Sequence, residues 1–212
     1  MNTVFTIFLA LHIASGTIGL LLGTFIMFKP KGDSLHKKLG RIFAVSMILT
    51  GLCAFILAYI HPNNFLIAVG IFTIYLTATS WRYLRLKNLN NNQKPLTIDW
   101  FLMIFMVLGS IWFLKLGVQL LLLEEYFGII HLLFAWRGLT FAYQDYKTFS
   151  GKITTKNYWL LFHLQRMIGA YIAALTAFLV VNTPDRVSFI SWLLPSVVLI
   201  PLIIKWSRRF KK

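Results

Sequence analysis

The chain alternates seven long apolar segments with short polar connections, and this alternation limits its fold more than any other feature. A helix needs about 20 apolar residues to cross the roughly 30 Å hydrocarbon core of a bilayer. The segments that meet this requirement are 4–28, 41–60, 65–83, 100–123, 126–146, 158–181 and 187–205. We therefore predict an all-α fold, in which residues 1–212 form one polytopic bundle of seven transmembrane helices.

The amino-acid composition agrees with a membrane domain and argues against a nucleic-acid-binding one. Hydrophobic residues make up 58% of the chain and charged residues only 13%, about half the share that is usual in soluble proteins. The net charge is +15, but the basic residues are concentrated in the connections between the apolar segments. That distribution is typical of membrane topology, so we expect no nucleic-acid partner.

Lysine and arginine are concentrated in every second connection, which indicates the orientation of the bundle. Positively charged connections remain on the cytoplasmic side of a membrane. The basic side holds Lys29, Lys31, Lys37, Lys38, Arg41, Arg82, Arg85, Lys87, Lys94, Lys147, Lys152, Lys156, Lys205, Arg208, Arg209, Lys211 and Lys212, and the other side holds Arg186. We predict an outer N-terminus and a cytoplasmic C-terminus in the cell's inner membrane, with anionic lipids at the cytoplasmic face.

Three basic residues, Lys115, Arg137 and Arg166, fall deep inside apolar segments. Ionisable residues at such depth are costly and usually functional. At 1.5 Å per residue, Arg137 lies roughly 16 Å from the outer end of its segment and Arg166 roughly 12 Å from the inner end of its own. The acidic residues fall in connections or at segment ends: Asp33, Asp99, Glu124, Glu125, Asp145 and Asp185.

The deep cations are therefore predicted to have no carboxylate of this chain at their own level. We expect them to bind an anion, such as a haem propionate, a lipid phosphate or another acidic small molecule. The alternative is that backbone carbonyls and polar side chains such as Gln119, Gln165 or Thr140 solvate them. Lys115 has a further alternative, because a lysine side chain can extend to the membrane interface.

Four histidines fall at two depths, His12 and His131 in the outer half and His36 and His163 in the inner half. Two imidazoles at one level on facing helices can ligate the iron of a b-type haem. We predict His12 with His131, and His36 with His163, as iron ligands. Arg166 follows His163 by three positions and would share its helix face, beside a propionate.

Other chemistry is less well supported by the sequence. The one cysteine, Cys53, excludes an internal disulfide, and there is no CxxCH or HExxH motif. A metal site without haem would need His12, His131 or His61 to meet Glu124 or Glu125. No glycine-rich nucleotide-binding motif is present, so electrons would come from a membrane redox partner or a quinol. Whether the protein is an enzyme stays open.

Three short motifs resemble a known group of proteins: His12-Ile13-Ala14-Ser15-Gly16, His36-x-x-x-Gly40-Arg41 and His163-x-x-Arg166-Met167. Over about half the chain they are similar to bacterial polytopic membrane proteins grouped as a domain of unknown function, which implies no particular activity. The placement of the histidines also resembles, more loosely, the membrane di-haem b-type cytochromes. That similarity implies a helical bundle in which four histidines hold two haems.

Small residues predict which helices pack closely in the bundle. Gly16, Gly19 and Gly23 lie in the first segment, and Gly169 and Ala170 lie in the sixth. Such residues allow helix backbones to approach one another within a membrane. We therefore expect the first and sixth segments to lie in the middle of the bundle.

Three functions remain open from the sequence. The first is a membrane protein that binds haem b or a similar anionic cofactor, which would allow electron transfer across the membrane. The second is a transporter or lipid-handling protein that binds an acidic substrate at Lys115, Arg137 and Arg166. The third is a structural or assembly subunit without a ligand.

Overall fold

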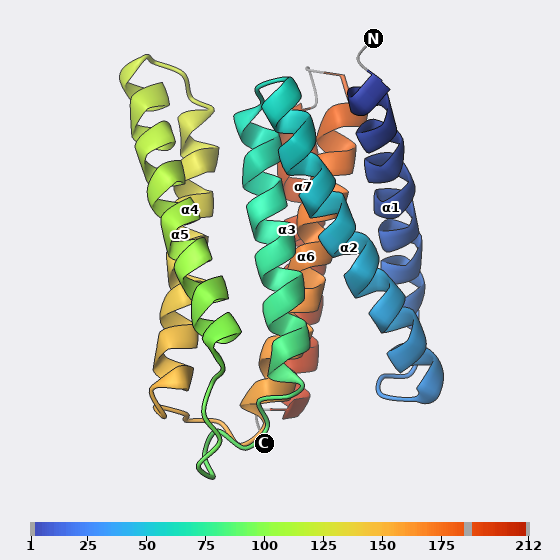
Figure 1. Ribbon diagram of the computed structural model, residues 1–212, viewed down its shortest axis with the longest axis vertical. Helices are drawn as coiled ribbons and strands as arrows, with labels where there is room; N and C mark the ends of the chain where they lie inside the picture. The colour runs from blue at the N-terminus through green and yellow to red at the C-terminus, as the bar shows by residue number, and fades with distance from the viewer. Residues whose placement is uncertain (1–2, 185–187, 211–212) are drawn as a thin grey trace.

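The computed structural model describes residues 3–184 and 188–210, which form seven α-helices and no β-strand (Figure 1). The helices are α1 Thr3–Phe28, α2 Ser34–Ile60, α3 Asn64–Tyr83, α4 Thr97–Leu122, α5 Gly128–Phe149, α6 Tyr158–Asn182 and α7 Ser188–Phe210. The predicted all-α fold is confirmed. Some predictions concern residues outside the described ranges, namely Asp185, Arg186, Val187, Lys211 and Lys212.

Six of these helices are long and apolar enough to cross a membrane: α1, α2, α3, α4, α6 and the part of α7 from Ile190 to Arg208. The outer surface carries many exposed apolar side chains, such as Leu21, Leu108 and Val197. Such an exterior is suited to contact with lipid rather than water, so the fold is that of a membrane protein. Helix α5 is not among the six, and it contains Arg137, Asp145 and Lys147.

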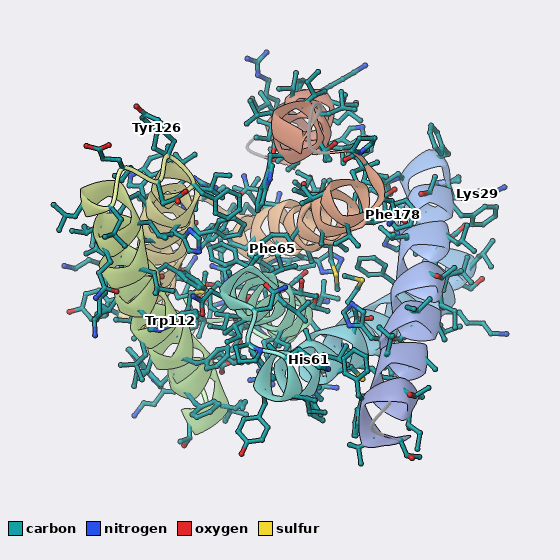
Figure 2. The ribbon with its side chains drawn as sticks, turned by 90° about the horizontal axis from the view of Figure 1, so that it is seen from above. Lys29, His61, Phe65, Trp112, Tyr126 and Phe178 are labelled. Atoms are coloured by element: carbon teal, nitrogen blue, oxygen red, sulfur yellow. The ribbon has the colours of Figure 1, made fainter. Side chains whose placement is uncertain are left out.

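Helices α3 and α6 lie between two helical pairs, α1 with α2 on one side and α4 with α5 on the other (Figure 1). Helix α7 packs on α6, as the view along the bundle shows (Figure 2). The main hydrophobic core surrounds α3, where Tyr75 is fully buried beside Met106 and Phe113 of α4. The prediction for the sixth segment agrees with the contacts of α6 to α1, α3 and α7.

The prediction that the first segment lies in the middle of the bundle is wrong. Helix α1 is at the edge, against α2 and one side of α6 (Figure 2). Its glycines still permit close contacts, because a Cβ on Gly19 would lie 2.6 Å from the sulfur of Met47 and one on Gly23 would lie 2.4 Å from the ring of Tyr171. Small residues thus indicate close packing on a partner helix, which an edge helix also has.

Helix α2 begins seven residues earlier than the predicted segment. Asp33 is its N-cap, and its carboxylate accepts a hydrogen bond of 2.6 Å from the backbone N–H of His36. A side chain that satisfies one of the first N–H groups stabilises the start of a helix. Ser34 is therefore the first residue of the helix, and His36 lies in its first turn.

Close backbone contact and an ion pair position the α4–α5 hairpin. At the tip of the hairpin, Gly117 and Gly128 approach so closely that a Cβ on Gly128 would lie 2.5 Å from the carbonyl oxygen of Gly117. At the other end of α4, Arg82 of α3 makes two hydrogen bonds of 2.7 and 2.9 Å to Asp99. Asp99 also accepts a hydrogen bond from the N–H of Leu96. The hairpin is thereby fixed beside α3.

Candidate functional site

Arg166 has a carboxylate partner inside the protein, and the expectation that it has none is wrong. Its two terminal nitrogens donate hydrogen bonds of 3.0 and 2.5 Å to the oxygens of Asp145. The side chains are 1% and 0% exposed. The cause lies in helix length, because α5 continues to Phe149 instead of ending near Tyr146. Asp145 is therefore a full turn inside the helix and faces the interior.

Two tyrosines of α3 complete the environment of Asp145. Tyr75 donates a hydrogen bond of 2.5 Å to one carboxylate oxygen, and Tyr83 donates one of 2.6 Å to the other. Residues eight apart lie on one face of a helix, so both hydroxyls reach the same group. With Arg166, they give Asp145 four hydrogen bonds. A buried ion pair is stable only when such additional bonds satisfy it, and this one joins α3, α5 and α6.

We expect Tyr83→Phe to lower the free energy of unfolding by about 1.5–3 kcal/mol, because it removes a buried hydrogen bond to a charged group. Unfolding of the purified protein in mixed micelles, followed by its circular dichroism, measures the change. Tyr59→Phe is the control, since Tyr59 is exposed. Equal stability of the two variants would show that the hydroxyl of Tyr83 does not contribute.

Arg137 lies exposed near the middle of α5. It is roughly 14 Å along the helix from Gly128 and roughly 18 Å from Phe149. Its guanidinium carbon lies 4.6 Å from the ring centre of Phe141 and 5.5 Å from that of Trp136. Within residues 3–184 and 188–210, Arg137 has no ion pair and no hydrogen bond from its side chain. Aromatic rings orient this cation, and no acid in the described part of the chain neutralises it.

The two deep arginines share one aromatic neighbour. The guanidinium carbon of Arg166 lies 5.8 Å from the ring centre of Phe141, the ring that Arg137 also contacts. We call Arg137, Phe141, Asp145 and Arg166, with the two tyrosines, the two-arginine cluster. Its formal charge is +1, because Asp145 neutralises one of two guanidinium groups. The buried Nε of Arg166 also has no hydrogen-bond partner in the described part of the chain.

The structure places Lys115 apart from this cluster. It is exposed on α4, where Phe113 and Gly117 face α5 through contacts with Phe134 and Leu132. Two positions along a helix rotate a side chain by about 200°, so Lys115 faces away from α5. The polar side chains predicted as alternative partners do not bond the arginines either. Gln165 donates to Ser207, Thr140 donates to the carbonyl oxygen of Trp136, and Gln119 is exposed.

The outer pair of histidines is not brought together. Nδ1 of His12 lies 3.0 Å from the carbonyl oxygen of Thr50 in α2. His131 is buried, and its Nδ1 lies 3.3 Å from the carbonyl oxygen of Phe127 in its own helix. Helices α1 and α5 lie on opposite sides of the bundle (Figure 2). The two residues have a similar predicted depth in the membrane, but they are not neighbours in the bundle.

The inner pair lies closer together. Nδ1 of His163 lies 3.0 Å from the hydroxyl and 3.2 Å from the carbonyl oxygen of Ser80. Such a bond fixes the ring and leaves Nε2 for another partner. His36 lies within electrostatic range of His163, and its buried Nδ1 has no hydrogen-bond partner among the residues described. These two rings are the histidines that the fold brings into one region.

A metal site without haem has no geometric support. In the described ranges, no three side chains of His, Cys, Asp or Glu come together as metal ligands do. His61, which ends α2, instead packs against the ring of Phe5. No family model, curated protein or solved structure matches the chain. The proposals that follow therefore depend on geometry and charge.

Proposed function

We propose that this protein is a multi-pass protein of the cytoplasmic membrane that binds an anionic ligand at Arg137. The observation that supports this function is the contrast between the two deep arginines. Arg166 is neutralised by Asp145, whereas Arg137 contacts the rings of Phe141 and Trp136 and has no acidic partner among the described residues. A charge at hydrocarbon depth is costly unless it is paired, so an anion at Arg137 stabilises this arrangement.

The proposed topology has seven spans, with the N-terminus outside and the C-terminus in the cytoplasm. Helix α5 is included because its 22 residues extend about 33 Å and it lies along α4. Its polar residues His131 and Asp145 are buried in the protein, so they do not oppose insertion as exposed ones would. The basic connections then lie at the cytoplasmic face, where they contact anionic lipids.

The chemistry of Arg137 suits recognition of a carboxylate or phosphate. A guanidinium group is planar, remains charged, and can donate two parallel hydrogen bonds to such a group. Phe141 and Trp136 hold it through cation–π contacts, and its nitrogens have no hydrogen-bond partner within residues 3–184 and 188–210. We therefore assign the protein to the handling or transport of an acidic substrate, with Lys115 and Arg166 outside the ligand contacts.

Arg137→Gln is expected to reduce the retention of anionic small molecules about tenfold or more, which corresponds to about 1.4 kcal/mol. Native mass spectrometry of the protein released from lipid nanodiscs measures the bound fraction. Lys115→Gln is the matched control, because it removes an exposed cation from the same hairpin and should leave retention unchanged. If Arg137→Gln retains the same molecules as the wild type, the protein has no anion site there and a subunit without a ligand is favoured.

A second candidate function, haem binding, is favoured by the inner histidines. His163 is held through Nδ1 by Ser80, and His36 presents a nitrogen without a partner. Each ring therefore has a nitrogen that an iron atom could use. The residues fit a single haem b better than two, because His12 and His131 lie on opposite sides of the bundle. Electrons would come from a quinol or a membrane redox partner.

If haem binds there, protein purified from haem-replete cells will show Soret and α bands after reduction with dithionite. His36→Ala and His163→Ala are each expected to abolish these bands, because each removes one axial ligand. His12→Ala is the control and should retain them. A wild-type spectrum without the bands, or full bands in the His163 variant, would exclude the inner histidines as haem ligands.

A further inference from the structure

We infer that the ligand of Arg137 is a single-chain amphiphile with one carboxylate, of the fatty-acid class. This inference depends on the proposed function, which requires only that some anion binds at Arg137. It follows from the charge of the two-arginine cluster, the shortage of polar partners around Arg137, and the apolar surface next to it.

The charge of the cluster favours a ligand with one negative charge. Asp145 already accepts hydrogen bonds from both terminal nitrogens of Arg166 and from two tyrosines. The remaining formal charge is therefore the +1 of Arg137. A monoanion makes the whole cluster neutral, whereas a dianion would replace an excess positive charge with an excess negative one. At hydrocarbon depth a net charge of either sign is costly.

The polar groups near Arg137 favour a small acidic head. Within one helical turn on α5, two side chains besides Arg137 can donate a hydrogen bond: Thr140, whose hydroxyl donates to the carbonyl oxygen of Trp136, and Trp136, through its indole N–H. The two oxygens of a carboxylate match the two parallel N–H groups of a guanidinium. A phospholipid head group would bring additional hydroxyl and ester oxygens, more than these few donors can satisfy, and unsatisfied polar groups are costly in an apolar environment.

The neighbouring surface favours an apolar chain. From Arg137 towards the start of α5, the exposed side chains are Trp136, Leu133 and Ile129, at 61%, 50% and 50% exposure. They form a continuous apolar strip, because residues three and four apart lie on adjacent turns of one face. A hydrocarbon chain that extends from a carboxylate at Arg137 can follow this strip, whereas a small soluble acid would gain nothing from it.

Binding of radiolabelled oleate to the full chain in phosphatidylcholine nanodiscs tests this inference, with empty nanodiscs subtracted. We expect saturable binding by the wild type and by Lys115→Gln, and about tenfold weaker binding by Arg137→Gln. Unlabelled oleate should compete, and oleyl alcohol, which has the same chain without the charge, should not. A second measurement replaces part of the phosphatidylcholine with phosphatidylglycerol and counts the lipids retained by native mass spectrometry.

The outcomes separate this inference from the proposed function. If phosphatidylglycerol is retained through Arg137 while oleate does not bind, the fatty-acid inference is overturned and the proposed anion site stands. If neither molecule depends on Arg137, both are overturned. Competition by oleyl alcohol equal to that by oleate would show that the chain alone is recognised, which also contradicts the inference.

Discussion

Replacement of Asp145 with alanine is expected to lower the free energy of unfolding by about 3–5 kcal/mol, because it leaves a buried charge without its partner. Arg166 is 1% exposed, so its guanidinium cannot turn to water when Asp145 is removed. The hydroxyls of Tyr75 and Tyr83 lose the same acceptor. Reversible unfolding in mixed micelles measures the loss. Glu125→Ala, which removes an exposed acid from the α4–α5 turn, is the control and should change stability little.

A double variant separates the ion pair from the space that its side chains fill. Asp145→Leu with Arg166→Met removes both charges and keeps apolar volume, so we expect it to be more stable than either single variant. Replacement of a buried ion pair by apolar residues is often close to neutral, although the two tyrosine hydroxyls would still lack an acceptor. If the losses of the single variants simply add in the double variant, the two side chains are not coupled.

Gly128→Val is expected to destabilise the α4–α5 hairpin by about 3 kcal/mol, at the upper end of the usual cost of overpacking. A Cβ on Gly128 would lie 2.5 Å from the backbone carbonyl oxygen of Gly117 and 2.9 Å from Leu121. Because the first of these contacts is with backbone, only separation of the two helices can relieve it. The same measurement of unfolding applies to this variant.

Gly40→Val in α2 is the matched control for this steric effect. It places the same side chain on a helical glycine, where an added Cβ meets nothing within 4 Å. We expect a much smaller loss of stability at this position. Similar losses at both positions would mean that helix propensity, and not the close approach of α4 and α5, determines the cost.

The helices themselves could be predicted well from the sequence, because the length of a span is set by the thickness of a membrane. The sixth segment was expected at 158–181 and is observed at Tyr158–Asn182. The apolar segment predicted for α2 begins at residue 41, whereas the helix begins at Ser34, because its cap is Asp33 and it starts within a charged stretch. Apolar length predicts the membrane-embedded part of a helix, whereas caps determine where the helix ends.

The partners of the site residues were harder to predict. Counting residues gives the depth of a side chain but not its lateral neighbours, so His12 and His131 were placed together although their helices are on opposite sides of the bundle. Asp145 was assigned to a helix end because α5 was expected to stop three residues too early. The spacing of Tyr75 and Tyr83 was a usable signal, since two hydroxyls on one face of an apolar helix require a polar partner.

The contrast between Arg166 and Arg137 is the central claim, and solid-state NMR of the protein in liposomes tests it most directly. With ¹⁵N-labelled arginine and ¹³C-labelled side-chain carboxyls of Asp and Glu, dipolar recoupling measures which guanidinium groups lie against a carboxylate of the chain. We predict a strong coupling between Arg166 and Asp145 and none from Arg137 to any labelled carboxyl. A coupling of Arg137 to an acidic residue of the protein would contradict the claim, because the proposed ligand position would already be occupied.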